Sequence, residues 1–197
     1  MIAIIDSGGA NIASVQFALE RLDVEAILTK DVKIIQSADK VLLPGVGAAP
    51  IAMQNLAEYG LIDCIRGLTQ PVMGICLGMQ LLFAASPEGN TPLLGIFDAD
   101  CGTFTPAQGR SVPHMGWNRL SKQQDHALLA GVDKGAHVYF VHSYFAPVTA
   151  QTIAATNYGD DFTAIVVENN FMGCQFHPEK SGLVGAQILR NFLEMPS

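Results

Sequence analysis

The sequence predicts an α/β fold in which a mixed, mainly parallel sheet is flanked by helices and carries additional antiparallel strands. In the first half of the 197-residue chain, and again at its end, short apolar runs alternate with stretches of helical spacing, which is typical of parallel βαβ units. Between about residues 96 and 167 short β-branched and aromatic runs are separated by Gly, Pro and Asn, which is typical of antiparallel strands. Length and the lack of any linker or repeat predict a single domain over residues 1–197.

The predicted parallel strands are short apolar runs closed by turn residues. Pro44 is expected to end the third of them, because proline lacks the N–H group that continues a ladder. The carboxyl ends of such strands face the crevice where ligands bind, so residues that directly follow them are candidates for a functional site. These strands are expected at residues 2–6, 24–28, 41–43, 71–75 and 172–176.

The predicted helices lie between and after these strands. Asn11 can cap the first helix, and Gly60 and Gly67 are expected to break the second. The antiparallel region is expected to form strands around the runs TFTP, HVYFVHSYF, TIAAT and TAIVVE, either inserted in the α/β core or added to it. The helices are expected at residues 11–22, 53–68, 77–85 and 183–195.

Composition and charge exclude several classes of function. The net charge is −7, from 11 basic and 18 acidic residues without a Lys/Arg cluster, which predicts binding neither to nucleic acid nor to an anionic membrane. No basic leader and no apolar run of membrane-spanning length is present, so a soluble cytoplasmic protein is expected. The cysteines form no CxxC pair, which argues against a zinc ribbon or a redox motif and favours reduced thiols at Cys64, Cys76, Cys101 and Cys174.

The stretch GICLGMQLLF, residues 74–83, contains the first candidate for catalysis. An apolar strand changes to helical spacing at Cys76, between two glycines that avoid a clash at a tight bend, as in a nucleophile elbow. The start of a helix supplies free N–H groups and partial positive charge, which lower the pKa of a thiol. The backbone N–H of Leu77 can also stabilise an oxyanion. The alternative is a buried cysteine that only fills the core.

The segment GCQFHPEKSG, residues 173–182, supplies the base that a thiolate needs. His177 directly follows a predicted strand, and Pro178 ends that strand and stiffens the loop. Glu179 can accept a hydrogen bond from the imidazole and fix its tautomer. The alternative is a solvated histidine beside a surface glutamate. Cys174, three residues earlier, is interpreted as a core residue.

The segment LLPGVGAAP, residues 42–50, places two glycines directly after a strand. A phosphate loop is a weak interpretation, because no GK[ST] follows. A loop that offers backbone N–H groups across the crevice from Cys76 is a second interpretation, and a simple turn is a third.

Taken together and in this order, PGVGA, GICLGMQLLF and QFHPEKSG resemble the class I, or triad-type, glutamine amidotransferases over nearly the whole chain. The resemblance implies the flavodoxin-like fold of that family. It also implies hydrolysis of glutamine to glutamate and ammonia through a cysteine thioester, with no metal or other cofactor. Under it, Cys76 is the nucleophile, His177 the general acid and base, and Glu179 the residue that orients His177.

The resemblance also implies residues that bind the substrate. Val46 and Gly47, together with the N–H of Leu77, correspond to the oxyanion hole, and Gln80, one helical turn after Cys76, corresponds to a residue that binds glutamine. Separately, three residues at the end of a predicted strand can hold the α-amino and carboxylate ends of glutamine through backbone and hydroxyl groups. The alternative for them is a half-buried strand with aromatic packing; they are His142, Ser143 and Tyr144.

Within this family, PHMGWN (113–118), YFVHSYF (139–145) and SGGANIASV (7–15) resemble the glutaminase subunits of imidazole glycerol phosphate synthase, an enzyme of histidine biosynthesis. This implies a heterodimer with a (β/α)8-barrel cyclase subunit that receives ammonia, and an interface that contains Asn11, Trp117 and Asn118. Ala10 stands where most relatives have glycine. Trp117 can instead be a core residue, and His114 is expected to be structural or interfacial.

Other functions stay open at this point. One is a glutaminase subunit for another amidotransferase, although PHMGWN argues against it. Others are an elbow-type cysteine hydrolase that acts alone, and a non-catalytic relative kept for its interface. Because released ammonia is lost to water, the isolated chain is expected to be nearly inactive until a partner turns the PGVG loop into its active state. His126 and His137 receive no predicted role.

Overall fold

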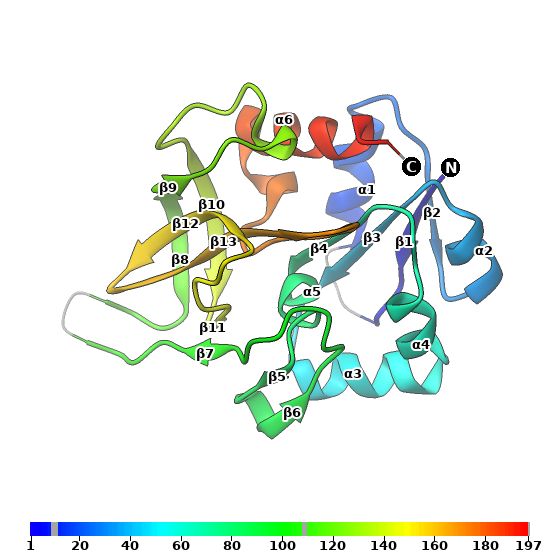
Figure 1. The fold of residues 1–197 in the computed structure, drawn as a ribbon, viewed down its shortest axis with the longest axis horizontal. Helices are drawn as coiled ribbons and strands as arrows, with labels where there is room; N and C mark the ends of the chain where they lie inside the picture. Colours follow the sequence, from blue (N-terminus) through cyan, green and yellow to red (C-terminus); the bar gives the residue numbers. More distant parts are fainter. Residues whose placement is uncertain (9–11, 108–109, 197) are drawn as a thin grey trace.

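The computed structural model describes residues 1–8, 12–107 and 110–196. Within them, one sheet of eight strands has the order β2-β1-β3-β4-β14-β13-β12-β9 (Figure 1). Its parallel part consists of β1 (Ile2–Ile5), β2 (Ala26–Thr29), β3 (Lys40–Gly45), β4 (Val72–Cys76) and β14 (Phe171–Cys174). Its antiparallel part consists of β13 (Asp160–Glu168), β12 (Thr152–Tyr158) and β9 (Lys122–Gln123). The predicted mixed sheet is therefore confirmed.

In the part of the chain that the structure describes, three short ladders lie outside this sheet, so the middle of the chain contributes only some of its strands to the sheet. The longest joins β8 (His114–Arg119) to β10 (His137–His142) and packs on α6 and β12. The chain continues from β10 into β11, so this ladder leads directly to the segment around Tyr144. The other two ladders pair β7 (Gly102–Thr103) with β11 (Tyr144–Phe145) and β5 (Ala85–Ser86) with β6 (Thr91–Pro92).

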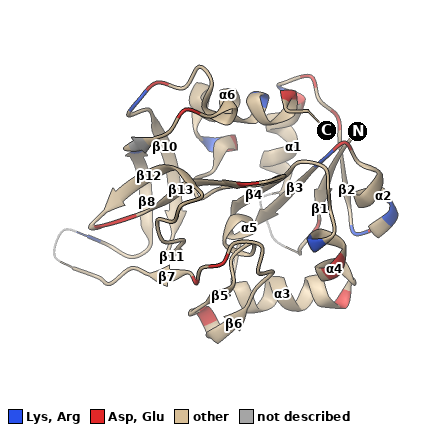
Figure 2. Cartoon of the chain, viewed as in Figure 1, with Lys and Arg blue, Asp and Glu red and all other residues tan. Residues whose placement is uncertain are grey.

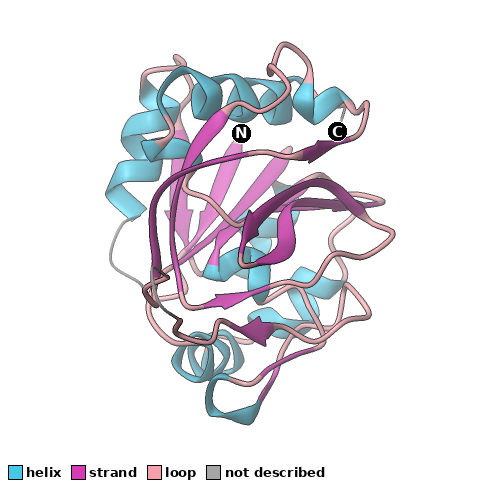
Figure 3. Cartoon of the chain, turned by 90° about the vertical axis from the view of Figure 1, so that its left-hand side faces the viewer, coloured by secondary structure: helices cyan, strands magenta, loops and turns pink. Residues whose placement is uncertain are grey.

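Helices cover both faces of the sheet (Figures 1 and 3). Alternate residues of a strand point to opposite faces, so Ile4 joins one apolar core and its neighbours Ala3 and Ile5 join the other. The first core includes α1 (Ile12–Glu20) and α6 (Gly182–Glu194). The second includes α2 (Val32–Ser37), α3 (Ala49–Glu58) and α4 (Leu61–Arg66). The described residues also form three 3₁₀ turns: η1 (Glu88–Asn90), η2 (Ala127–Leu129) and η3 (Pro178–Lys180).

Helix α2 was not predicted, although its start carries a clear signal. The Asp31 carboxylate accepts hydrogen bonds from the backbone N–H groups of Lys33 and Ile34, and thereby caps the helix. With only six residues, the helix is too short to show apolar periodicity. The predicted cap Asn11 of the first helix lies outside the described residues.

Two strand boundaries differ from their predictions. The strand expected at 24–28 begins only at Ala26, because the N–H of Val24 still bonds the Leu19 carbonyl at the end of α1. The prediction that Pro44 ends β3 is wrong: Pro44 lies within β3, and its partner on β4 is Ile75. The strand thus reaches Gly45, level with Cys76.

The helix predicted for residues 77–85 is also too long. Helix α5 (Leu77–Gln80) ends after four residues, because from Leu82 onward the N–H groups, those of Leu82 and Phe83, bond to carbonyls three residues back and form tight turns. Their own carbonyls then accept hydrogen bonds from the segment around Gly95 and Ile96. Tertiary contacts therefore replace the next helical turn.

Charged residues are dispersed over the molecule. Figure 2 shows the Lys and Arg positions of the described elements separated from one another, with Asp and Glu between them. In the part of the chain that the structure describes, every helix is too short or too polar to cross a membrane.

Candidate active site

Cys76 ends β4 and directly precedes α5, so the predicted order of strand, sharp turn and helix is confirmed. Its backbone angles are φ +55° and ψ −112°, a conformation that a residue with a side chain adopts only at a cost in energy. The flanking glycines are needed for space. A Cβ atom on Gly78 would lie 1.7 Å from the Leu43 carbonyl oxygen, and one on Gly74 would lie 2.5 Å from the Gly78 oxygen. The tight approach of α5 to β3 and to β4 therefore excludes larger residues at these two positions.

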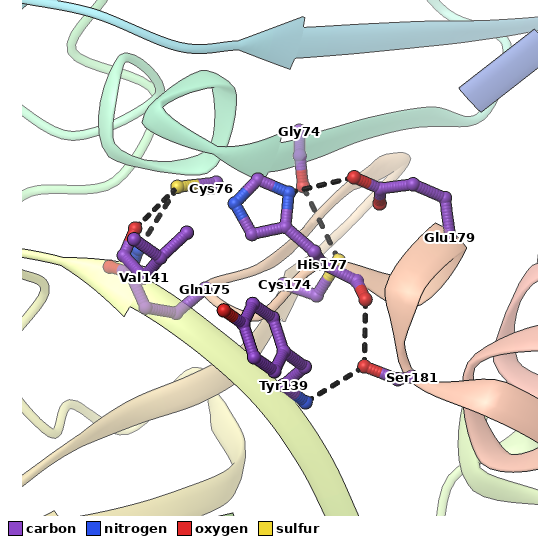
Figure 4. Close-up of polar contacts among 9 residues, drawn as sticks. All are labelled: Gly74, Cys76, Tyr139, Val141, Cys174, Gln175, His177, Glu179 and Ser181. Atoms are coloured by element: carbon purple, nitrogen blue, oxygen red, sulfur yellow. Dashed lines mark hydrogen bonds and ion pairs between the residues drawn. The ribbon is translucent and has the colours of Figure 1, made fainter. Parts of the chain in front are cut away.

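His177 comes close to Cys76 because β14 is the parallel neighbour of β4, with Cys174 opposite Ile75. Figure 4 shows the imidazole between Cys76 and Glu179, with one ring nitrogen directed to each side. The His177 Nδ1 atom lies 2.8 Å from Glu179 Oε1, and both side chains are buried. The alternative of a solvated histidine beside a surface glutamate is therefore wrong.

The loop that carries His177 is held by backbone contacts. The His177 N–H donates to the Tyr139 carbonyl oxygen at 2.9 Å. The Ser181 hydroxyl donates to the His177 carbonyl at 2.7 Å and accepts from the Tyr139 N–H at 2.9 Å (Figure 4). The ladder strand β10 and helix α6 thus fix the imidazole position from two sides.

The site favours the charged form of this histidine. Burial by itself lowers the pKa of His177, but its interactions with Cys76 and with Glu179 outweigh burial and raise the pKa to about 10. An imidazolium facing the sulfur is the state in which a thiolate is available as a nucleophile.

The other cysteines lie in surroundings that keep them neutral. Burial raises the pKa of Cys64, raises that of Cys101 to about 12, and raises that of Cys174 well above its usual range. Cys174 is fully buried, which confirms its interpretation as a core residue.

A cavity of about 500 Å³ lies over Cys76. All four predicted substrate-binding residues line it, and so do the three residues predicted for the oxyanion hole. Glu179 lies behind His177 and does not line this cavity. The lining residues are Val46, Gly47, Cys76, Leu77, Gln80, Glu88, Pro113, Val141, His142, Ser143, Tyr144, His177 and Lys180.

The Gln80 carboxamide is held in one orientation. Its Nε2 atom donates to the Tyr144 carbonyl oxygen at 2.7 Å and to Gln175 Oε1 at 3.0 Å. A backbone carbonyl can only accept, so the atom beside Tyr144 must be the nitrogen. Both hydrogens of Nε2 are thereby used, and the amide has only its oxygen, Oε1, to offer to a ligand.

The PGVG loop forms the opposite wall of the cavity. Gly45 is paired with Cys76 at the end of the β3–β4 ladder, and Gly47 has φ +96°, a region that favours glycine. Helix α3 follows directly, and its Ala49 N–H donates to Glu88 Oε2 at 2.8 Å. The PGVG loop thus lies across the cavity from Cys76, as expected of a loop that donates backbone N–H groups. Its role as an oxyanion hole stays a prediction.

Several residues of this site were not predicted from the sequence. Gln175 is fully buried, and its Nε2 atom lies 3.9 Å from the Cys76 sulfur. The sequence could have indicated Gln175, because it is an amide within a predicted apolar strand and a buried amide needs a hydrogen-bond partner. Val141 accepts from the same sulfur through its carbonyl oxygen at 3.7 Å. Glu88 and Lys180 carry no sequence signal for the cavity, since only the fold brings them to it.

The predicted interface residues have different surroundings. Trp117 is 57% exposed on β8, so the alternative that it is a core residue is wrong. The Asn118 amide donates to the Asn157 carbonyl oxygen at 3.0 Å and also lies near His114. Asn11 lies outside the described residues. His126, which had no predicted role, caps η2 by accepting from the Leu128 N–H.

No group of three His, Cys, Asp or Glu side chains that could hold a metal ion occurs among the residues that the structure describes.

Comparison with known proteins gives a family match and close relatives. The family model described as "Glutamine amidotransferase class-I" matches residues 3–195. The chain is 54% identical to an "Imidazole glycerol phosphate synthase subunit HisH" of Xanthomonas axonopodis pv. citri, with 98% of this chain and 97% of the relative covered. A protein of the same name from Mannheimia succiniciproducens is 49% identical, with 97% and 98% covered.

Solved structures agree in fold at low sequence identity. A structure described as a glutamine amidotransferase superposes with a TM-score of 0.74 at 22% identity and covers 98% of this chain and 97% of its own. A glutamine amidotransferase from Thermotoga maritima gives a TM-score of 0.61 at 17% identity, with 98% and 80% covered. With the family model matching almost every residue, the chain belongs to the class I glutamine amidotransferase family.

Proposed function

We propose that residues 1–197 act as one amidotransferase domain and as the cytoplasmic glutaminase subunit of an imidazole glycerol phosphate synthase. The chain hydrolyses glutamine and passes the ammonia to a (β/α)8-barrel cyclase subunit in a heterodimer. The observation that carries the chemistry is the placement of the His177 imidazole between Cys76 and Glu179. The name shared by relatives that are 49–54% identical over nearly the full chain supports the choice of partner.

In the first half of the reaction, the Cys76 thiolate attacks the side-chain carbonyl carbon of glutamine. The carbonyl oxygen becomes an oxyanion, for which the N–H groups of Leu77 and of the Val46–Gly47 segment are the candidate donors at the cavity wall. The His177 imidazolium gives its proton to the leaving nitrogen, the C–N bond breaks, ammonia departs, and a glutamyl thioester remains on Cys76.

In the second half, water hydrolyses the thioester. The now neutral His177 takes a proton from the water, whose oxygen attacks the thioester carbon. The C–S bond breaks, which releases glutamate and restores the thiolate beside the imidazolium. The Glu179 carboxylate holds Nδ1–H throughout, so the other nitrogen, Nε2, exchanges the proton with the reactants.

The cavity has groups suited to the polar ends of glutamine. Gln80 presents Oε1 to an N–H donor of the substrate, because both hydrogens of its Nε2 atom are already used. Glu88 lines the cavity, and a negatively charged carboxylate there suits the α-ammonium group of glutamine. Ser143 and Tyr144 line the same cavity, and their backbone N–H and hydroxyl groups are the candidates for binding the α-carboxylate.

The partner surface includes the exposed face of β8. Trp117 and Met115 alternate with inward-facing residues on this strand and are 57% and 62% exposed. Large apolar side chains of this kind are enriched where proteins associate. The same ladder holds the His177 loop through Tyr139, so a cyclase docked on it can influence the site.

Glutamine hydrolysis by the purified chain, with and without the cyclase subunit from the same organism, tests this function. We expect glutamate to form at an appreciable rate only in the complex, together with glutamine-dependent turnover of the cyclase. A diazoketone analogue of glutamine should label Cys76 in the complex and abolish both activities. Full activity against peptides or esters without a partner would instead identify a hydrolase that acts alone.

A further inference from the structure

Two buried histidines face each other behind the wall of the cavity. His114 on β8 and His142 on β10 are directly opposite in the antiparallel ladder, and 3% and 6% of their surfaces are exposed. The His114 Nδ1 atom lies 3.0 Å from the His142 Nε2 atom. Neither ring is needed for the triad chemistry described above.

The hydrogen-bond partners determine which nitrogen of each ring carries a proton. His142 Nδ1 lies 2.8 Å from the Tyr144 carbonyl oxygen, which can only accept, so this nitrogen is protonated. Burial lowers the pKa of His142 to about 3 and that of His114 to about 4, so each neutral ring has a single N–H at neutral pH. The His142 Nε2 atom therefore accepts, and its donor is His114 Nδ1–H.

The remaining nitrogen of His114 then has to accept as well. Its partner is the Asn118 amide, whose Nδ2 atom lies 3.3 Å from His114 Nε2 and also donates to the Asn157 carbonyl oxygen. The chain of donors thus starts on β8, beside exposed Trp117, and ends at the Tyr144 carbonyl inside the molecule. In each hydrogen bond of this chain, only one of the two atoms can be the donor.

Aromatic packing holds the first ring of this chain. The His114 ring is stacked between Tyr158, at a centroid distance of 4.0 Å and an angle of 26°, and Phe140, at 4.9 Å and 27°. The edge of Phe104 closes a third side at 6.1 Å. The ring cannot tilt without breaking these contacts, so its Nδ1–H stays directed at His142.

The chain of donors continues into the cavity through one backbone oxygen. The Tyr144 carbonyl accepts both from His142 Nδ1–H and from Gln80 Nε2–H. Its position sets where the Gln80 amide nitrogen lies, and so where Gln80 Oε1 points.

We propose that His114 and His142 are positioning residues that, through the Tyr144 carbonyl, hold the Gln80 carboxamide with its oxygen toward the glutamine substrate. The proposal rests on the proposed glutaminase function. It assigns the pair to substrate binding: loss of the His114 donor frees the ring of His142, the Tyr144 carbonyl loses its second donor and can shift, and the Gln80 amide that bonds this carbonyl shifts with it.

A matched pair of variants at His114 tests this role, because His114 does not itself line the cavity. In the complex with the cyclase, His114→Leu keeps a side chain of similar size but removes the donor. We expect the KM for glutamine to rise about tenfold, the factor that loss of one ordinary buried hydrogen bond produces, with kcat changed less than about threefold. His114→Asn restores an N–H near the Nδ1 position, and its KM should return to within about threefold of wild type.

A double-mutant cycle separates this role from a general structural one. If His114 acts through Gln80, then His114→Leu should raise KM little further in a Gln80→Ala background. Equal KM values for the Leu and Asn variants, or full additivity with Gln80→Ala, would overturn the proposal. An inactive wild-type complex would instead refute the proposed function, and the NMR measurement described next would then decide on the positioning role.

The proton arrangement can be measured on the wild-type protein without any substitution. Nitrogen NMR of protein labelled in histidine should show both buried rings protonated at Nδ1 and not at Nε2. These signals should stay constant between about pH 5.5 and 8, because both pKa values lie far below this range. An Nε2–H tautomer at either ring would break the chain of donors and refute the proposal, whether or not the variants fold.

Discussion

The Cys76 sulfur and the Gln175 amide nitrogen lie 3.9 Å apart although 99 residues separate them in the chain. The contact exists because β14 is inserted between β4 and the antiparallel strand β13, which puts the loop after β14 beside the elbow after β4. Gln175, His177 and Glu179 all reach the sulfur or its base through this one strand pairing. The predictions below address this arrangement.

Replacing Cys76 should separate glutamine hydrolysis from the cyclase reaction. Cys76→Ala is expected to abolish glutamine-dependent turnover in the complex and to leave turnover with added ammonium salt within about twofold of wild type, because only the ammonia supply is lost. Cys64→Ala, at a buried position of α4, is the control and should keep both activities. Residual glutamine-dependent turnover by Cys76→Ala would contradict its role.

Replacing the partner of the imidazole should impair catalysis more than binding. Glu179→Gln keeps the size of the side chain but removes the charge that stabilises the imidazolium and fixes its tautomer. We expect kcat for glutamine hydrolysis to fall by about 10²-fold or more, with KM changed much less. Steady-state kinetics of the complex measure this split, and Glu168→Gln, at the end of β13, is the matched control that should stay near wild type.

The contacts of His177 with Cys76 and with Glu179 make stability depend on pH. The pKa of His177 is raised from 6.5 to about 10 in the folded chain, so over this range the folded state retains a proton that the unfolded state has lost. The resulting stabilisation is fully present below about pH 6.5 and is lost as the pH rises through about 10. Urea unfolding of the isolated chain across this range should show the decline. In Glu179→Gln, which keeps only the contact with Cys76, the decline should be weaker, and an equal decline in both proteins would argue against Glu179 as a source of the raised pKa.

The PGVG loop should tolerate no side chain at its second glycine. Gly47 has φ +96°, so Gly47→Ala strains the backbone even though a Cβ atom there meets nothing within 4 Å. If this loop supplies oxyanion donors, kcat should fall by about 10²-fold while the fold persists. Gly131→Ala, at φ +73° and remote from the cavity, carries a similar backbone strain and should lose stability without losing kcat.

The loop of the triad also depends on a close helix contact. A Cβ atom on Gly185 of α6 would lie 1.9 Å from the Pro178 carbonyl oxygen, so Gly185→Ala must push α6 away from η3. We expect a loss of about 2–4 kcal/mol in the free energy of unfolding of the isolated chain, measured in urea. Leu183→Ala on the same helix removes a side chain that is 90% exposed and should change stability by less than about 0.5 kcal/mol.

The sequence was sufficient to predict the parallel half of the sheet and that Cys76, His177 and Glu179 lie together. Both depend on local patterns in the sequence. One is an apolar run such as the one that ends at Cys76, and the other is a second apolar run followed by His177, Pro178 and Glu179. Parallel strands with intervening helices leave few possible arrangements, so residues at strand ends are expected to meet.

The antiparallel half could not be predicted in the same way. The choice of β13 as the neighbour of β14, and the separate ladder of β8 and β10, depend on contacts between residues far apart in the sequence. The His114–His142 pair exists only in that ladder, and the sequence had therefore indicated only backbone and hydroxyl roles around His142. Helix α5 was overestimated because local spacing carries no information on the turn that tertiary contacts impose after Gln80.

The central place of β14 has a consequence for how the protein matures in the cell. Synthesis proceeds from the N-terminus, and β14 with its base-bearing loop leaves the ribosome after both of its neighbours in the sheet, β4 and β13. Until then the gap between β4 and β13 cannot close, and the reactive thiol has no imidazole beside it. A chain synthesised only as far as β13 therefore lacks the base that its thiol needs, and the proposed hydrolysis has to wait for β14.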